Sequence, residues 1–240
     1  MHRQAAIVIA FAAAGATAAA AAVPSDPEAL RLMQLCRVAS GGNALDLPEA
    51  FRETGTIAQD NGPPGPYETF GDLHALRSAS RRTVDGKVRS AGFDGSLPWY
   101  ADGDGGTATA TAPPILRGER LGTWLTLSGY LHPDRFPASF RYLGRRQLRG
   151  RSYDIVLATP TDADSAQLWL DRATHRLAHI DSSTEGDRIV GDASDYRLVS
   201  GTWVAFALDI NQAGHLTHLR IGTFTYIPLS QAHLTPPAGA

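Results

Sequence analysis

The sequence predicts a β-rich α+β domain in which helices lie against one curved antiparallel sheet or barrel. Most of the chain consists of short segments in which apolar and polar residues alternate, with turn residues between them. Helical periodicity is confined to two stretches, too few for the alternating strand and helix order of a parallel sheet. No low-complexity linker divides the chain, so residues 23–240 are expected to form a single domain.

Residues 1–22 have the pattern of a cleavable signal peptide. His2 and Arg3 provide a short positive start, an apolar stretch follows, and the alanine run to Ala22 offers small-residue cleavage sites before Val23. An uncleaved membrane anchor is the alternative, because roughly 18 apolar residues can cross a bilayer. The run is mainly weakly apolar alanine, which favours cleavage. The mature chain is therefore expected to be periplasmic or secreted, with no stable transmembrane segment.

The composition limits the functions that are open to the chain. The 240 residues are 43% hydrophobic with a formal net charge of -2, which predicts a buried core and argues against a nucleic-acid-binding protein. Cys36 is the single cysteine and has no partner for an internal disulfide. We expect it to be a small buried side chain on a helix, with a catalytic thiol as the alternative. Its position after Leu35, far from the cleavage region, argues against lipoprotein acylation.

The mature chain is expected to begin with a helix that starts at Asp26. Asp26 can cap the helix, Pro27 suits its first turn, and Glu28 lies at the positive end of the dipole. Apolar or small residues at 32, 35, 36 and 39 then share one helical face. The pair at 41–42 is Gly-Gly, which is expected to end the helix, and a short turn is expected around Asp46–Phe51.

From Glu53 to Thr111 the pattern predicts strands. Asp85-Gly86 indicates a hairpin between the strands Arg81–Val84 and Lys87–Phe93. Residues 102–106 read Asp-Gly-Asp-Gly-Gly, a flexible turn between the strands 97–101 and 107–111. A calcium loop is the alternative for this turn, but the bidentate acid that closes an EF-hand loop is missing.

A second helix is expected over Ile115–Tyr130. Positions 121, 124, 125 and 128 form its stripe, Gly118 and Gly122 weaken it, and His132-Pro133 is expected to end it. The rest of the chain again alternates as strands, for example from Val204 to Ile210. A hairpin turn is expected at residues 171–174, between the strands 167–170 and 176–180.

The sequence carries no recognisable catalytic motif. Gly92-Phe93-Asp94-Gly95-Ser96 has the wrong order for the Gly-x-Ser-x-Gly turn of a serine hydrolase. Asp94-Gly95-Ser96 is also a permuted form of the Asp-Thr/Ser-Gly of aspartic proteases. No glycine-rich phosphate-binding loop occurs. We therefore assign no catalytic residue and no cofactor, and expect the chain not to be an enzyme.

The histidines and one arginine-rich run are the remaining polar candidates for a site. His215 and His218 are three apart in a predicted strand, so they point to opposite faces, and His175 and His179 lack the further ligands of a zinc site. His132 could act with Asp134 in an unrecognised hydrolase, or simply end the helix. We assign no metal. The run 145–151, which holds four arginines, could meet anionic lipid or a partner, or be a solvated hairpin turn.

The large aromatic and aliphatic side chains are the remaining feature that can indicate a site. A curved sheet lined by such side chains, with a helix over its mouth, would form a pocket for an acyl chain or lipid. The alternative is that the same side chains fill the core. The expected pocket residues are Phe93, Trp99, Leu121, Trp124, Leu125, Phe140, Tyr142, Trp169, Trp203 and Phe206.

Several short motifs run in order through the mature chain. They are Ala39–Leu45, Glu53–Ile57, Gly92–Gly95, Trp99, Tyr142–Gly144, Leu168–Thr174, Ser194–Arg197, Gly201–Phe206 and Pro236-Pro237. In these motifs the chain resembles the periplasmic lipoprotein carriers LolA and LolB. It is similar to a broad group of exported proteobacterial proteins, some of which carry this module ahead of a retropepsin-like aspartyl protease domain. Each motif marks a turn or strand, so none specifies chemistry.

The resemblance implies an incomplete β-barrel closed by two or three helices around a cavity that binds acyl chains in the carriers. No protease motif and no lipidation cysteine is present, so neither a peptidase nor a LolB-like anchored acceptor is implied. The sequence thus predicts a non-enzymatic periplasmic protein that binds a lipid, acyl chain or other apolar ligand. Lipoprotein or envelope lipid traffic is the process in which such a protein is expected to act. The alternative is a structural or protein-interaction module of the envelope with an envelope protein partner.

Overall fold

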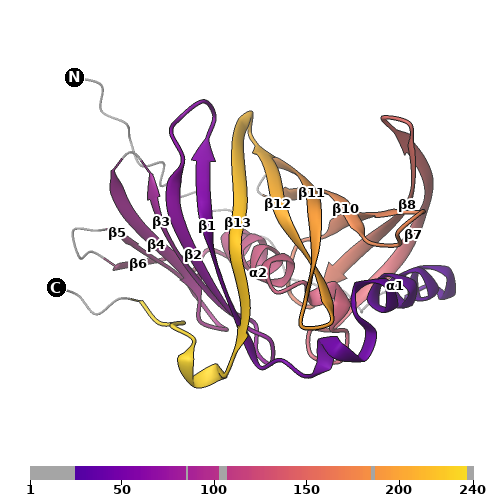
Figure 1. The fold of residues 1–240 in the computed structure, drawn as a ribbon, viewed down its shortest axis with the longest axis horizontal. Coiled ribbons are helices and arrows are strands. Elements are labelled where there is room, and N and C mark those ends of the chain that lie inside the picture. Colours follow the sequence, from indigo (N-terminus) through magenta and orange to yellow (C-terminus); the bar gives the residue numbers. More distant parts are fainter. Residues whose placement is uncertain (1–24, 85, 103–106, 185–186, 237–240) are drawn as a thin grey trace.

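The computed structural model describes residues 25–84, 86–102, 107–184 and 187–236. The predicted signal peptide at 1–22, Asp85 of the predicted hairpin, most of the predicted turn at 102–106 and Pro237 lie outside the described residues. The described chain contains one antiparallel sheet, two α-helices and three short 3-10 segments (Figure 1).

All described strands belong to a single 13-stranded sheet. Its order is β6-β5-β4-β3-β2-β1-β13-β12-β11-β10-β9-β8-β7. The strands are β1 (Ala50–Gln59), β2 (Gly65–Asp72), β3 (Arg77–Val84), β4 (Lys87–Phe93), β5 (Pro98–Asp102), β6 (Thr107–Thr109), β7 (Ala138–Leu148), β8 (Arg151–Pro160), β9 (Ala166–Asp171), β10 (Leu177–Thr184), β11 (Asp187–Val199), β12 (Thr202–Gln212) and β13 (His215–Ile227).

The chain builds this sheet as two meanders. The first runs outward from β1 to β6, helix α2 then crosses to the far side, and the second runs back from β7 until β13 pairs with β1. Because β6 and β7 stand at opposite edges of the sheet, the barrel is incomplete. The sheet curves around α2, which lies on its concave side (Figure 1). The predicted fold class, a curved antiparallel sheet covered by helices, is confirmed.

Helix α1 (Pro27–Ser40) begins and ends where the sequence predicts. The Asp26 carboxylate accepts a hydrogen bond from the Ala29 amide at 2.6 Å and a second from the Tyr142 amide of β7 at 2.6 Å. The same acid therefore caps the helix and covers the edge strand. The predicted short turn at 46–51 is wrong in position, because a 3-10 segment (η1) spans Gly42–Asp46 and the strand β1 begins at Ala50.

Helix α2 (Pro113–Thr126) is shorter than predicted. Leu127 donates back to the Thr123 carbonyl, and Ser128 then takes a left-handed conformation with φ 50°, which ends the helix before His132 is reached. A 3-10 segment (η2) follows at Gly129–Leu131, and a third (η3) lies at Leu229–Gln231. Within the described ranges, no helix is both long and apolar enough to cross a membrane.

The described residues form one large core cluster that includes both helices, a smaller one on the central strands, and a third of Ala79, Trp99 and Ala101. The large cluster includes Leu32 and Cys36 of α1, Leu121 and Trp124 of α2, and Leu168 of β9. Cys36 is fully buried, and burial raises the pKa of its thiol to about 12, which confirms the structural role expected for it. The smaller cluster consists of Ile57, Tyr67, Phe206 and Ile221.

Candidate functional site

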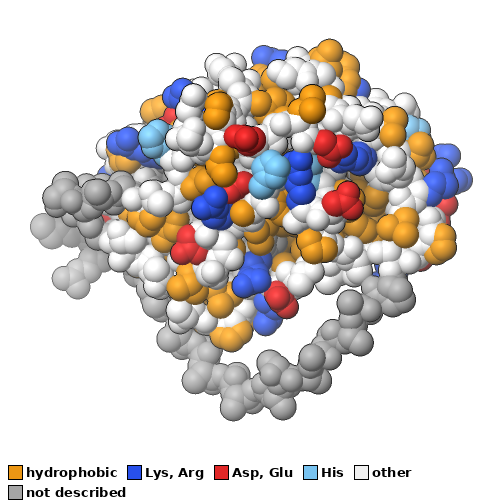
Figure 2. Space-filling view, turned by 90° about the horizontal axis from the view of Figure 1, so that it is seen from below, with side chains coloured by type: hydrophobic (Ala, Val, Ile, Leu, Met, Phe, Trp, Pro, Cys, Tyr) orange, Lys and Arg blue, Asp and Glu red, His pale blue; other side chains and the backbone are white. Residues whose placement is uncertain are grey.

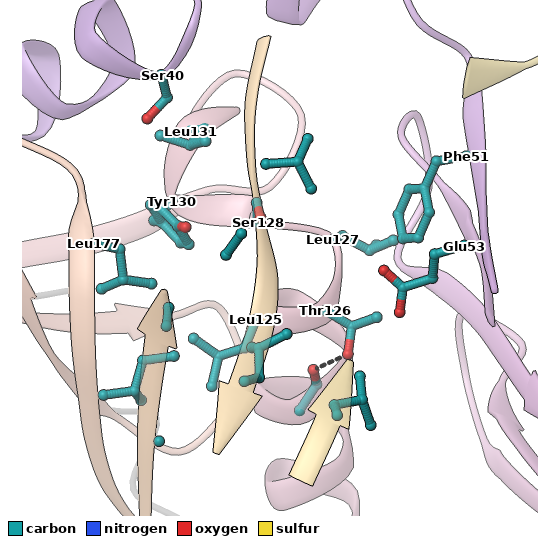
Figure 3. Close-up of a pocket in the computed structure, with 18 of the residues that line it drawn as sticks. Ser40, Phe51, Glu53, Leu125, Thr126, Leu127, Ser128, Tyr130, Leu131 and Leu177 are labelled. Carbon is teal, nitrogen blue, oxygen red and sulfur yellow. Dashed lines mark hydrogen bonds between the residues drawn. The ribbon is translucent and has the colours of Figure 1, made fainter. Parts of the chain in front are cut away.

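A cavity of about 410 Å³ lies between α2 and the concave face of the central strands. Residues of β1, β13, β12, β11 and β10 form one wall, and α2 with the segment Leu127–His132 forms the other. The volume falls in the range of roughly 300–1,000 Å³ that is usual for ligand pockets. Figure 3 shows side chains from both walls pointing into the same space.

The β1–β13 part of the wall follows from strand periodicity. Alternate residues of a strand share one face, so Phe51 and Glu53 both point to the concave side. Their direct partners on β13 are Tyr226 and Phe224, and Phe51 stacks on Phe224 with ring centroids 5.1 Å apart. A register shift after Thr54 then brings Ile221 into the same wall. The wall is therefore aromatic and aliphatic, with one acid in it.

Helix α2 contributes two leucines and two glycines to the cavity, and the members of each pair lie four residues apart. Leu121 and Leu125 line the cavity, as do Gly118 and Gly122. A Cβ at Gly118 would lie 2.2 Å from Cγ2 of Thr184 on β10, so this glycine lets the helix approach the sheet. Gly122 is exposed where it lines the cavity, and a Cβ there would meet nothing within 4 Å.

Glu53 is the charged side chain at the centre of the β1 wall. Its carboxyl is directed toward Leu127 and Thr126 of the opposite wall (Figure 3). Burial raises the pKa of Glu53 to about 7, and the hydroxyl groups of Thr69 and Tyr67 beside it act in the opposite direction. Thr69 lies directly across from Glu53 on β2. The protein therefore holds a carboxyl in an apolar cavity, where its ionised form is disfavoured.

His132 also lines the cavity, at the end of the η2 segment, as do several hydroxyl side chains and a second acid, Asp192 of β11. It is 5% exposed, and its Nδ1 atom is buried without a hydrogen-bond partner among the described residues. Burial, together with Arg135 and Arg37, lowers the pKa of His132 to about 4. Asp134, its partner in the hydrolase hypothesis, is exposed to solvent. His132 is therefore a neutral imidazole at the cavity wall at physiological pH.

The structure brings three of the ten predicted pocket residues to this cavity: Leu121, Leu125 and Trp203. Five of the others, Phe93, Trp99, Trp124, Phe140 and Phe206, are buried in the packing of the sheet and helices. Tyr142 donates a hydrogen bond to Asp154 at 3.0 Å, and Trp169 packs against Tyr153 and His179.

Sequence reasoning missed the β1–β13 wall, including Phe51, Glu53, Phe224 and Tyr226. Strand alternation at 51 and 53 was the available signal, because it places an acid on the same face as a phenylalanine. An acid on an otherwise apolar strand face is the pattern that marks a site.

Three other histidines lie beside carboxylates. His179 Nδ1 lies 2.7 Å from Asp192, and His218 Nδ1 lies 2.6 Å from Asp209, which also faces Arg220. His215 lies 3.1 Å from Asp60. In the part of the chain that the structure describes, no three His, Cys, Asp or Glu side chains gather as a metal site would require. Acidic and basic side chains are also interspersed with apolar ones on the face shown in Figure 2.

Similarity to solved structures identifies the fold of the chain. No protein-family profile matches the sequence. No curated protein matches it either. Solved structures do match: a LolA superfamily protein from Nitrosomonas europaea shares 10% sequence identity at a TM-score of 0.56, with 84% of this chain and 94% of that chain covered. The chain has the LolA-like fold.

Two further solved structures have a similar fold. A candidate outer membrane lipoprotein-sorting protein domain from Vibrio parahaemolyticus has 11% identity and a TM-score of 0.56, covering 85% of this chain and 95% of that one. A DUF1329 family protein from Desulfovibrio piger has 12% identity and a TM-score of 0.56, covering 84% and 94%. At these identities the likeness concerns the fold, and it confirms the LolA-like incomplete barrel that the sequence motifs imply.

Proposed function

We propose that this chain is a non-enzymatic periplasmic protein that binds a lipid, acyl chain or other apolar ligand in the cavity between α2 and the central strands. The observation that carries the proposal is the cavity itself, about 410 Å³ in volume and bordered by Phe51, Leu121, Leu125 and Phe224. An apolar chain that enters it leaves water, which is favourable by about 25 cal/mol per Å² of buried apolar surface. The predicted signal peptide and the LolA-like fold support the same reading.

Helix α2 acts as the movable lid of the cavity. Its first half is held by contacts at the protein surface: Arg117 faces Asp164 at 3.1 Å, and the Tyr100 hydroxyl donates to Glu119 at 2.6 Å. Exposed pairs of this kind contribute about 0–1 kcal/mol each, so they can open at low cost. Its second half is anchored by Trp124, which is 1% exposed. The helix can therefore lift from its first turn while its end stays packed.

Native mass spectrometry of the exported protein tests this function. We expect species heavier than the polypeptide, and we expect organic-solvent extraction of the same sample to yield an apolar compound. Incubation with a long-chain lipid should shift the mass of any ligand-free fraction. A protein that carries no apolar compound and takes up none would contradict the proposal. That outcome would favour an interaction module that acts through the exposed arginines of the β7–β8 hairpin.

A further inference from the structure

Glu53 is an acid whose surroundings offer it no positive charge. Glu68 faces Arg52 at 2.6 Å, and Asp209 faces Arg220 at 2.7 Å. Within the described residues, by contrast, Glu53 takes part in no ion pair, and neither arginine nor lysine lines the cavity. A carboxylate placed in an apolar wall without a cation is costly, so its presence there calls for a role in the site.

The neighbours of Glu53 leave part of its hydrogen-bonding capacity unused. Thr69 and Tyr67 on β2 place their hydroxyls beside the carboxyl. Phe224 lies directly opposite on β13, and Leu127 faces it from beyond the end of α2. A carboxylate has about four acceptor sites on its two oxygens. The sites that face the cavity can be satisfied by a bound molecule that donates hydrogen bonds.

We propose that Glu53 selects the polar group of the ligand: the cavity takes an apolar chain that carries a hydrogen-bond-donating group, an alcohol or an amine, and disfavours chains that carry a carboxylate or phosphate. This inference rests on the proposed function. A donor or cation beside Glu53 gains a charge-assisted hydrogen bond that little water can screen. An anionic group meets a like charge in a site without an arginine to neutralise it. The same residue thus attracts one class of ligand and excludes the other.

Three single-chain compounds of equal length test the selection. Dodecylamine, dodecanol and dodecanoate should displace the fluorescent probe N-phenyl-1-naphthylamine from the cavity at pH 8.5, where Glu53 is largely ionised. In the wild-type protein we expect dodecylamine to bind at least about tenfold more tightly than dodecanoate, with dodecanol between them. Glu53→Gln should bring the amine and the carboxylate to within about threefold of each other.

Glu68→Gln is the matched control, because it removes the same charge from the opposite face of the neighbouring strand β2. It should keep the wild-type ranking. The selection is refuted by a wild-type protein that prefers dodecanoate, or by a Glu53→Gln variant that binds the probe and keeps the wild-type ratio. If the wild-type protein binds neither the probe nor any of the three chains, the proposed function itself is wrong.

Discussion

Glu53→Gln is expected to raise the free energy of unfolding by about 3 kcal/mol at pH 9 and to change it little at pH 4.5. The pKa of Glu53 rises from the ordinary 4.5 to about 7 in the folded protein. Below pH 4.5 the carboxyl is protonated in both states and has no effect on stability. As the pH rises toward 7 the unfolded chain ionises first, so the folded state loses stability, and the loss is complete above pH 7. Glutamine removes this loss.

Urea unfolding of the wild type and the variant at both pH values measures the effect. Glu68→Gln serves again as the control, because it breaks an exposed pair with Arg52 and should change stability by less than about 1 kcal/mol at either pH. Equal stability of Glu53→Gln and wild type at pH 9 would show that the carboxyl is well solvated. An acid that destabilises the fold at physiological pH is typical of a residue retained for binding.

A disulfide between α2 and β10 is expected to slow ligand exchange by at least about tenfold. A Cβ at Gly118 lies 3.4 Å from Cβ of Thr184, close to the separation of about 3.5–4.5 Å in disulfides. Gly118→Cys/Thr184→Cys should therefore pin the first half of the helix to the sheet. The native Cys36 should not interfere, because it is fully buried and the pKa of its thiol is raised to about 12.

The measurement is the rate at which N-phenyl-1-naphthylamine leaves the protein when excess lipid vesicles capture it. The oxidised double variant should release the probe slowly, and reduction should restore the release rate. Thr184→Cys alone controls for the loss of the threonine. Release from the oxidised variant at the rate of the reduced one would mean that α2 does not move during exchange.

Much of the fold could be predicted because it depends on local patterns. Strand alternation, the capping acid Asp26 and the hairpin turn at 171–174 are short-range signals, and the structure contains each of them. The Asp171 carboxylate accepts from the Ala173 and Thr174 amides at 2.9 Å, so this turn is built from its own residues. The end of α2 could not be predicted in the same way, because Ser128 takes a left-handed conformation that its type does not require.

The candidate site was less predictable, because side-chain size does not separate a core from a cavity. Trp124 and Leu125 are neighbours on one helix, yet Trp124 is 1% exposed in the core and Leu125 lines the cavity. The wall at Phe51 and Glu53 depends on the pairing of β1 with β13, strands that are far apart in the chain. The sequence places Glu53 on an apolar strand face, but only the pairing of β1 with β13 and the curvature of the sheet around α2 turn that face into the wall of a cavity.

Binding of N-phenyl-1-naphthylamine to Gly122 variants tests the central claim most directly. Gly122 lines the cavity, and a Cβ there meets nothing within 4 Å. Gly122→Ala should bind the probe as the wild type does and be more stable by about 1 kcal/mol, since alanine favours the helix. Gly122→Phe should fill the cavity and bind the probe at least about tenfold more weakly. Wild-type affinity in Gly122→Phe, or no saturable binding in the wild type, would contradict the account.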